Sequence, residues 1–392
     1  MRLPAVACEL SWVSMARLLM SALALLALCS TVAAQQTQTC GAPISNGDGW
    51  TIDRPESVGL DTGQLCTLDK FIGQWKEANI HAVVVARAGK LVMERYYSGP
   101  DERWGTPIGT IAYKPDVKHD LRSISKSVTS LLVGIALRRG KFPDLDTSVI
   151  DQFPEYASLR NADNERVTFR HLLTMSSGLK WDESIPYSNP ANSERQMIAA
   201  ADPIRYVLEQ PVIAPPGSVY NYNGGNTTLL AAVLTKATGK RLDDYAKENL
   251  FGPLGITDFE WVSLPSTGQP AAASGLRLRP RDSAKLGQLM VADGVWADTQ
   301  ILPRGWTGSS MKPRINGEGL YYYGYQWWLG RTMRNDQSVH WAAGVGYGGQ
   351  RLYVVPDLDL VVMINAGHYG GPLQATIPFG IFTRVVLPAV KE

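Results

Sequence analysis

The apolar and polar positions along the chain predict strands near both ends and helices between them. Alternation through residues 81–87 and 90–97, on either side of Ala88-Gly89, is typical of a β-hairpin. From residue 123 to about 259 the pattern is helical, with loops that contain proline and asparagine. Further strand patterns follow in the last part of the sequence, at residues 324–329, 349–356 and 358–365.

This order of elements predicts an α/β (α+β) fold, with one antiparallel sheet built from both chain ends and flanked by helices. We expect an irregular segment at residues 35–64 and a mostly helical inserted region at residues 123–264. The sheet region is expected to combine residues 65–122 with residues 265–392. A functional site is then expected in the cleft between the sheet and the helical region.

Residues 1–34 have the pattern of a signal peptide. An apolar run at residues 18–32 ends in Val32-Ala33-Ala34, which supplies small residues for cleavage. Residues 1–14 then precede Met15 as an upstream extension of the reading frame. The run is shorter than the roughly 20 residues of a usual transmembrane helix. We therefore expect an exported protein, periplasmic or secreted, without stable membrane insertion after cleavage; a membrane anchor is the alternative.

Composition narrows the classes of partner and cofactor. The chain has 38 Lys and Arg against 36 Asp and Glu, and this near-neutral balance without basic runs argues against nucleic acid. Cys40 and Cys66 follow the leader and are expected to pair in an oxidising compartment, with two free thiols as the alternative. No His or Cys spacing of the H-E-x-x-H or C-x-x-C kind occurs, so neither a metal nor another cofactor is expected.

The tetrad Ser123-Ile124-Ser125-Lys126 stands directly before the apolar run Val128 to Leu137. A hydroxyl and an amine three positions apart lie on the same face of a helix, which supplies a nucleophile together with its base. A serine at a helix start also lies near free backbone N–H groups, and burial would lower the pKa of Lys126. Two similar tetrads are less suitable. Residues 67–70 lie in a charged stretch typical of a surface helix, and Ser177 is followed directly by Gly178, a residue that ends helices.

Several stretches, in the same order, resemble the serine β-lactamase and penicillin-binding-protein hydrolases on the class C β-lactamase side. They are residues 122–130, 168–179, 222–230, 279–290 and 346–350. Within this family the chain looks most similar to the 6-aminohexanoate-dimer (nylon-oligomer) hydrolases and related esterases. The resemblance covers about residues 65–390 and implies a β-lactamase/transpeptidase-like fold.

The resemblance also implies roles for individual residues. Ser123 matches the acylated nucleophile, Lys126 the lysine that deprotonates it, and Tyr222 the tyrosine that relays a proton to the leaving group. Tyr220 remains an alternative to Tyr222. The backbone N–H groups of Ser123 and Gly344 match the two donors of the oxyanion hole.

The sequence departs from the family pattern in two places. Gly224 stands where the second motif usually has an asparagine, so the neighbouring Asn223 becomes a candidate substrate-binding residue. The Lys-Thr/Ser-Gly of the third motif corresponds to Trp341-Ala342-Ala343, which lacks the cation that binds a substrate carboxylate. His340 and Trp341 on that strand are therefore further candidates for substrate binding.

These features together predict an exported serine hydrolase that cleaves an amide or ester bond in a small molecule through a Ser123 acyl-enzyme. A β-lactamase or D-alanyl-D-alanine carboxypeptidase is one alternative, and it requires a cation from elsewhere, for example Arg331 or Arg351. A binding protein on the same scaffold that no longer turns over is another. The sequence leaves the oligomeric state open.

Overall fold

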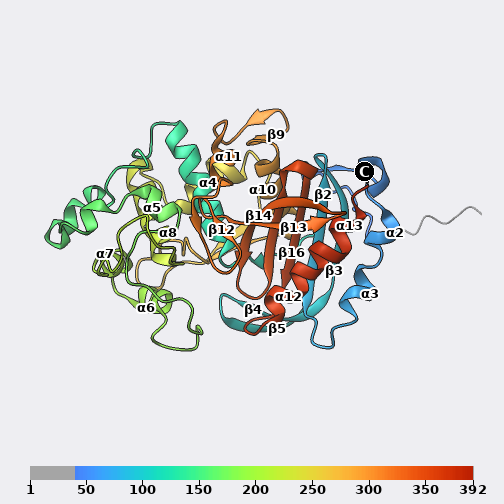
Figure 1. Cartoon of the computed structure of the whole chain (residues 1–392), viewed down its shortest axis with the longest axis horizontal. Helices are drawn as coiled ribbons and strands as arrows, with labels where there is room; N and C mark the ends of the chain where they lie inside the picture. Colours follow the sequence, from blue (N-terminus) through green and yellow to red (C-terminus); the bar gives the residue numbers. More distant parts are fainter. Residues whose placement is uncertain (1–39, 392) are drawn as a thin grey trace, which may run out of the picture. The chain divides into compact units, whose positions relative to one another are not determined.

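The structure is a computed structural model that describes residues 40–391 (Figure 1). The predicted signal peptide and the first five residues of the irregular segment lie outside the described residues. In residues 40–391, no helix has both the length and the apolar character that a membrane crossing requires. Cys40 and Cys66 are joined in a disulfide, with their Cα atoms 5.2 Å apart, which confirms the expected pairing.

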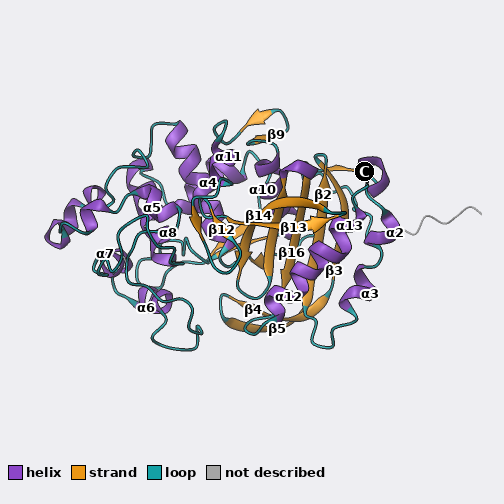
Figure 2. Ribbon diagram, in the orientation of Figure 1, coloured by secondary structure: helices purple, strands orange, loops and turns teal. Residues whose placement is uncertain are grey.

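The described residues form one large sheet in the order β1-β3-β2-β16-β15-β14-β13-β12-β11, shown in orange in Figure 2. Its strands come from both ends of the chain. They are β1 (Thr51–Ile52), β2 (Ile80–Arg87), β3 (Lys90–Tyr96), β11 (Ile315–Asn316), β12 (Tyr322–Tyr323), β13 (Trp328–Arg334), β14 (Gln337–Gly346), β15 (Gln350–Val355) and β16 (Leu360–Ala366). Neighbouring strands are antiparallel except for β1, which is parallel to β3. The pairing of β16 with β2 joins the two chain ends and confirms the predicted fold class.

Shorter strands lie outside the large sheet. They are β4 (Ser98–Arg103), β5 (Thr106–Ala112), β6 (His119–Asp120), β7 (Phe259–Trp261), β8 (Leu276–Leu278), β9 (Val295–Trp296) and β10 (Thr299–Gln300). Strand β6 pairs with β8, so the segment just before Ser123 is held beside the segment that follows the helical region. This pairing positions the residues just before Ser123 and therefore the start of the helix at Ile124–Arg138.

Helices cover both faces of the sheet and fill the inserted region (Figure 1). The α-helices are α2 (Thr62–Leu65), α3 (Leu68–Ile72), α4 (Ile124–Arg138), α5 (Phe169–Leu173), α6 (Ser193–Ala199), α7 (Pro203–Leu208), α8 (Gly224–Thr238), α9 (Leu242–Ala246), α10 (Pro280–Val291), α11 (Trp306–Ser310), α12 (Leu373–Gly380) and α13 (Leu387–Ala389). The other helical turns are η1 (Pro55–Val58), η2 (Ile150–Gln152), η3 (Pro154–Leu159), η4 (Asn164–Arg166), η5 (Lys247–Phe251), η6 (Pro356–Leu358) and η7 (Ile381–Val386).

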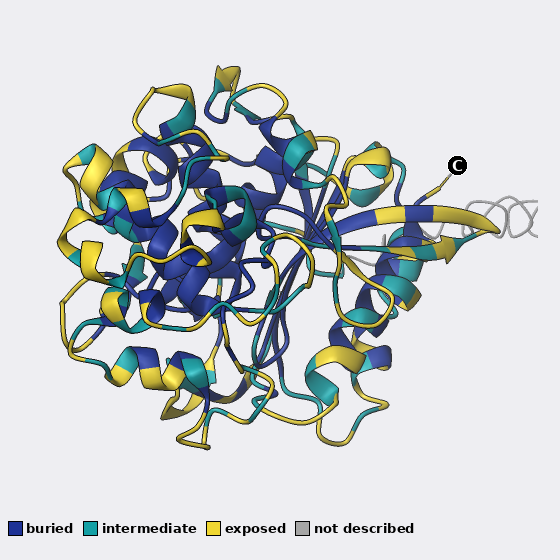
Figure 3. Cartoon of the chain, turned by 60° about the vertical axis from the view of Figure 1, so that its left-hand side comes forward, coloured by how far each residue is buried: buried dark blue, intermediate teal, exposed yellow. Residues whose placement is uncertain are grey.

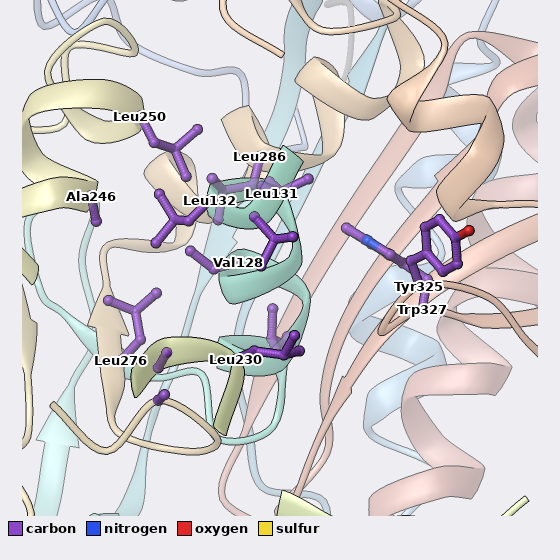
Figure 4. Close-up of a cluster of buried hydrophobic side chains, with 14 of the residues drawn as sticks. Val128, Leu131, Leu132, Leu230, Ala246, Leu250, Leu276, Leu286, Tyr325 and Trp327 are labelled. Carbon is purple, nitrogen blue, oxygen red and sulfur yellow. The ribbon is translucent and has the colours of Figure 1, made fainter. Parts of the chain in front are cut away.

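Alternation along the central strands divides the apolar residues into two cores. On β15 and β16, Leu352 and Val361 face α4 and α10, whereas Tyr353 and Val362 face α12 and η7. Successive side chains of a strand point to opposite faces, so a sheet covered on both sides needs apolar residues at nearly every position. Figure 4 shows the first core, where Val128 and Leu131 of α4 lie among side chains from α8 and α10. Figure 3 shows that burial is concentrated in the sheet and these central helices.

The predicted elements match the structure unevenly. The hairpin predicted at residues 81–97 is present as β2 and β3. The strand predicted at residues 324–329 begins later, at Trp328, because Gln326 takes a positive φ of 64° and turns the chain. The β4–β5 hairpin was not predicted, because its strands contain prolines, glycines and charged residues that weaken a strand signal.

Candidate active site

Ser123 and Lys126 meet at the start of α4. The Nζ of Lys126 donates a hydrogen bond to the Oγ of Ser123 over 3.0 Å and another to the carbonyl of Ala273 over 3.1 Å. Lys126 is only 1% exposed and Ser123 is 9% exposed. Ser123 is the residue that caps α4, so free N–H groups of the first helical turn lie next to its side chain. The arrangement joins a hydroxyl nucleophile to a buried amine.

Arg122 shapes the turn into α4. Its φ of 50° lies in the left-handed region, which side-chain-bearing residues rarely adopt. Its guanidinium Nε lies 3.3 Å from a carboxylate oxygen of Asp120, and its Nη2 lies 3.4 Å from Glu102. The guanidinium also lies 5.2 Å from the ring centre of Tyr369. These contacts hold a strained residue directly before Ser123, as is common where a functional side chain must be positioned.

Tyr222 lies against this pair. Its ring centre is 4.7 Å from the Nζ of Lys126, and its ring stacks on Trp328 at 5.8 Å. Burial and the neighbouring Glu183 raise the pKa of Tyr222 well above its ordinary value, although a hydrogen bond with Ser123 acts in the opposite direction. Tyr222 is therefore a protonated phenol at neutral pH, which suits a proton donor.

Tyr220, the alternative, lies elsewhere. Its ring packs against Tyr323 at 5.3 Å and Trp328 at 5.7 Å. Its hydroxyl is buried, and no hydrogen-bond partner from residues 40–391 reaches it. Of the two tyrosines, the structure brings Tyr222 to Ser123 and Lys126.

Ser123 lines a cavity of about 480 Å³. Its lining comes from the end of β4 and the β4–β5 turn, the start of α4, the loop before α6, α6 itself, the segment before β8 and the turn after β14. The residues are Glu102, Trp104, Gly105, Arg122, Ser123, Tyr187, Ser188, Glu194, Arg195, Ile198, Ser274 and Tyr347. Charged residues of both signs and aromatic rings thus surround the candidate nucleophile.

Gly344 does not line this cavity, whereas Tyr347, the first residue after β14, does. Gly344 packs beneath the helix start, where an added Cβ would lie 3.2 Å from Ile124 and 3.4 Å from the Oγ of Ser127. The oxyanion role of the Gly344 N–H stays a prediction, and the backbone N–H of Tyr347 becomes a second candidate for the same role.

The structure corrects the predicted placement of His340 and Trp341. The Trp341 ring packs with Tyr353 at 5.6 Å and Phe382 at 6.4 Å, in the core on the opposite face of the sheet from α4. His340 is exposed and lines a separate surface depression of about 800 Å³. Strand alternation turns Trp341 away from Ser123, and His340 lies on the part of β14 that pairs with Arg331, farther along the hairpin. Neither residue reaches the cavity around Ser123.

Asn223 is a helix cap whose side-chain nitrogen is buried without a hydrogen-bond partner in residues 40–391, and its role in substrate binding stays a prediction. Its side-chain oxygen accepts a hydrogen bond from the N–H of Asn226 over 3.1 Å, and its own N–H donates to the Sδ of Met175 over 3.3 Å. Asn223 is fully buried and does not line the cavity with Ser123. An N-cap asparagine stabilises the first turn of α8, which follows directly from its place before Gly224.

The two arginines considered as replacements for the missing cation lie away from the cavity. Arg351 is buried on the α12 face of the sheet, where it donates to the carbonyls of Gly346 over 3.2 Å and Gln374 over 3.0 Å. Arg331 is exposed and lines the same surface depression as His340. Neither places a positive charge beside Ser123.

Two acidic residues near the candidate site, Glu183 and Glu194, were not predicted from the sequence. One Glu183 oxygen accepts hydrogen bonds from the indole of Trp181, over 2.6 Å, and from the N–H of Gly224. One Glu194 oxygen accepts from the hydroxyl of Tyr187 over 2.8 Å. Burial and the neighbouring Glu194 raise the pKa of Glu183 to about 7, despite the opposing effect of Lys126. The signal in the sequence that could have indicated a site role for Glu183 is its position, four residues after the family motif at residues 168–179.

A group of buried side chains with metal-ligand chemistry lies at His81, Asp101 and His119, in the described part of the chain. The Nδ1 of His81 and the Nε2 of His119 are 2.8 Å apart. Two imidazole ligands of a tetrahedral zinc ion would lie about 3.3 Å apart, given zinc–nitrogen distances of about 2.0–2.1 Å. The observed spacing is that of a hydrogen bond between the rings, and the hydroxyls of Tyr113 and Tyr369 donate to Asp101. The group fits a buried hydrogen-bond network.

An antiparallel sheet with a serine and a lysine on the first turn of a packed helix, and a tyrosine facing both, defines a class of serine hydrolases that form acyl-enzymes. The family described as Beta-lactamase matches residues 73–374, and the chain belongs to this family. Membership places it among the β-lactamase-fold hydrolases.

Individual relatives span amide and ester hydrolysis. The 6-aminohexanoate-dimer hydrolase of Paenarthrobacter ureafaciens is 24% identical over 308 residues, which cover 74% of this chain and 72% of that protein. The lovastatin esterase of Penicillium rubens is 27% identical over 227 residues, covering 55% of this chain and 50% of the esterase. The chain is therefore related to hydrolases of both kinds.

Solved structures share the fold. A penicillin-binding protein from Bacillus halodurans has a TM-score of 0.61 at 18% identity, covering 80% of this chain and 99% of its own. EstCE1, a hydrolase with promiscuous acyltransferase activity, has a TM-score of 0.63 at 16% identity, with coverage of 84% and 99%. At these identities the likeness concerns the fold alone.

Proposed function

We propose that this protein is an exported serine hydrolase that cleaves an amide or ester bond of a small molecule through an acyl-enzyme on Ser123. The observation that carries the proposal is the 3.0 Å hydrogen bond between the Nζ of Lys126 and the Oγ of Ser123, with Tyr222 against the same amine. Ser123, the nucleophile, lines a cavity that can hold a small substrate, and the base and the proton donor are in contact with each other beside it.

In the proposed reaction, the Oγ of Ser123 attacks the substrate carbonyl while the Nζ of Lys126 takes the hydroxyl proton. The tetrahedral intermediate collapses as the bond from carbon to the leaving nitrogen or oxygen breaks, and the Tyr222 phenol protonates that atom. Lys126 returns a proton to Tyr222. A water molecule then attacks the acyl carbon and gives a proton to Lys126. The bond between the acyl carbon and the Oγ of Ser123 breaks, Lys126 passes the proton to that Oγ, and the carboxylic acid leaves.

The oxyanion of the intermediate requires backbone donors in this proposal. The N–H of Ser123 lies at the start of α4, where the helix dipole favours negative charge. The second donor comes from the β14 end, either Gly344, as the family resemblance implies, or Tyr347, which lines the cavity. Neither donor depends on a side chain, so the unusual third motif leaves this part of the mechanism intact.

The charges around Ser123 favour a substrate without a carboxylate. Arg122 lines the cavity, but its guanidinium is neutralised by Asp120 and Glu102. Arg195 is exposed and donates to the carbonyls of Tyr187 and Ser188. This distribution argues against β-lactams and D-alanyl peptides, which carry a carboxylate, and the relatives' names supply an amide and an ester as precedents.

The test is hydrolysis of a short-chain 4-nitrophenyl ester by the wild-type protein and by Ser123→Ala. We expect the rate to fall about a thousandfold or more in Ser123→Ala. Ser177→Ala, in the second Ser-x-x-Lys tetrad, is the matched control and should retain activity. Equal rates in wild type and Ser123→Ala would remove Ser123 from the mechanism, and no activity in the wild type would favour the binding-protein alternative.

Export is a separate part of the proposal, and it rests on the signal-peptide pattern in residues 1–34. Its test is the N-terminal residue of the protein recovered from a bacterial periplasm or culture medium. We expect a mature chain that begins near Gln35. Recovery of the uncleaved chain in the membrane fraction would support an anchor instead.

A further inference from the structure

His81 and His119 lie in the middle of a buried chain of hydrogen bonds. The Nδ1 of His81 and the Nε2 of His119 are 2.8 Å apart. The other ring nitrogen of His119, its Nδ1, lies 2.9 Å from the carbonyl oxygen of Asp120. The other ring nitrogen of His81, its Nε2, lies 2.9 Å from the Oδ1 of Asn79. Both imidazoles are fully buried, so these contacts decide where their protons lie.

The two ends of the chain fix the outer protons. A carbonyl oxygen only accepts, so the Nδ1 of His119 must carry a proton to bond to Asp120. The Nδ2 of Asn79 donates to two backbone carbonyls, over 2.8 Å and 3.1 Å, which leaves its Oδ1 as the acceptor that faces His81. The Nε2 of His81 therefore carries a proton as well.

The contact between the two rings requires a third proton. Of the two nitrogens that lie 2.8 Å apart, one must donate and the other must accept. Two neutral imidazoles carry one proton each, and together they supply only two of the three protons that the hydrogen bonds need. The pair of rings therefore holds one additional proton and has a net positive charge.

Two observations distinguish the rings. The Nε2 of His119 lies 3.5 Å from one carboxylate oxygen of Asp101, whereas the Nδ1 of His81 lies 3.9 Å from the other. Burial and the neighbouring His119 lower the pKa of His81 to about 3, which keeps that ring neutral. Both observations favour His119 as the charged ring, with its Nε2 donating to the Nδ1 of His81.

Asp101 supplies the opposite charge. Its side chain is buried, and its two oxygens accept hydrogen bonds from the hydroxyls of Tyr113 and Tyr369. Although burial opposes ionisation, His119 and these two hydroxyls lower the pKa of Asp101. A buried imidazolium is tolerated beside an ionised, hydrogen-bonded carboxylate, whereas an isolated buried charge is strongly unfavourable.

The other titratable groups around the rings have partners of their own. His368, which follows β16, accepts a hydrogen bond from a backbone N–H over 3.0 Å, and burial lowers its pKa. The carboxylate of Asp120 pairs with Arg277 over 3.0 Å and with Arg122 over 3.3 Å. Asp101 is therefore the carboxylate whose charge is left to balance the imidazolium.

The ion pair is tied to the strained turn before Ser123 by two routes. The Nδ1 of His119 holds the backbone of Asp120, whose carboxylate lies 3.3 Å from the guanidinium of Arg122. The hydroxyl of Tyr369 donates to the carboxylate of the ion pair, and the ring centre of this tyrosine lies 5.2 Å from the same guanidinium. Arg122, with its φ of 50°, immediately precedes the nucleophile.

We propose that His119 is a buried imidazolium at neutral pH and that, paired with Asp101, it positions the Arg122 turn ahead of Ser123. The positioning role rests on the proposed function, whereas the charge follows from the hydrogen bonds. Neither His119 nor Asp101 lines the cavity at Ser123, so both are positioning residues.

The test of the charge is nitrogen-15 NMR of the purified protein labelled in its histidines, at pH 7.5. An ordinary histidine is about nine-tenths neutral at this pH. We expect two protonated ring nitrogens in His119 and only one in His81. Substitution of each of the five histidines in turn assigns the signals. Neutral rings at both positions overturn the inference, and so does one equivalent of a metal ion bound by both rings.

The test of the positioning role is Asp101→Asn, which removes the opposite charge and keeps the shape. We expect the His119 ring to become neutral at pH 7.5 and kcat for a 4-nitrophenyl ester to fall about tenfold, because Ser123 is displaced. KM should change little, since the cavity lining is intact. Asp69→Asn is the matched control, because Asp69 is exposed but also accepts from a tyrosine hydroxyl, over 2.7 Å. It should keep the kcat and the charged His119 of the wild type.

The outcomes separate the inference from the proposed function. A wild-type kcat in Asp101→Asn overturns the positioning role. A wild type without Ser123-dependent hydrolysis contradicts the proposed function instead, and the NMR signals still decide the charge of His119. If Asp101→Asn does not fold, Tyr369→Phe replaces it, since this change removes only the hydroxyl that joins the ion pair to the ring beside Arg122. We expect a lower kcat in Tyr369→Phe, and an unchanged kcat overturns the positioning role.

Discussion

The Nζ of Lys126 and the Oγ of Ser123 lie 3.0 Å apart because the two residues stand three positions apart at the first turn of α4. The backbone of one turn sets this distance, with little help from the rest of the fold. The tertiary structure adds burial, the carbonyl of Ala273 and the ring of Tyr222 around the same amine. A local sequence pattern thus becomes a candidate catalytic group only inside the folded protein.

Replacing the lysine should remove the base. Lys126→Met keeps an unbranched, buried side chain but cannot accept the proton of Ser123, so kcat for a 4-nitrophenyl ester should fall about a hundredfold or more. Lys180→Met, which changes the exposed lysine of the second tetrad, should leave kcat close to that of the wild type. A Lys126→Met enzyme with full activity would contradict the proposed role.

Replacing the tyrosine should affect poor leaving groups most. Tyr222→Phe removes the phenol proton, so we expect amide hydrolysis to fall about a hundredfold or more. A nitrophenolate leaves without protonation, so hydrolysis of the nitrophenyl ester should fall much less. Tyr220→Phe, whose hydroxyl lies outside the site, should change neither rate appreciably. The comparison of anilide and ester rates for both variants checks the assignment, and the opposite pattern would favour Tyr220.

Glu183 should lower the stability of the fold at alkaline pH. Burial and Glu194 raise its pKa from 4.5 to about 7 in the folded protein. Between these values the folded state holds a proton that the unfolded chain has released, so the free energy of unfolding falls as pH rises through this range. Glu183→Gln should therefore be about 1 to 3 kcal/mol more stable than the wild type at pH 8 and similar to it near pH 4.5. Urea unfolding at both pH values measures the difference, and a difference that does not change with pH would be inconsistent with the raised pKa.

The disulfide between Cys40 and Cys66 closes a segment with a sequence separation of 26 residues. In the chain-entropy description, a loop of this length stabilises the fold by roughly 3 kcal/mol. We expect the Cys40→Ser, Cys66→Ser double variant to have a lower Tm than the oxidised wild type, with nearly unchanged kcat. Thermal unfolding with and without a reductant provides the measurement, and an identical Tm in all samples would show that the bridge adds no stability.

The prediction from sequence worked best where a few neighbouring residues decide the outcome. The β2–β3 hairpin follows from alternation around Ala88-Gly89, and the geometry of Ser123 and Lys126 follows from helical spacing. The prediction of Trp341 as a substrate contact was wrong because it depended on the face of β14 that this residue occupies. Its neighbours Ala342 and Ala343 are small and apolar, so no alternation of polar and apolar residues revealed that face.

The sequence by itself determined that a nucleophile and its base stand on one helical turn, because such a pair needs only local backbone geometry. Only the tertiary structure decided that Tyr222, 96 positions after Lys126, lies over the same amine. It also decided that Glu183 and Glu194 converge on Gly224. These residues are brought together by the packing of α8 against α4, by the loop that carries Glu183 and by α6, which carries Glu194. Contacts at such separations depend on the whole core rather than on any one segment.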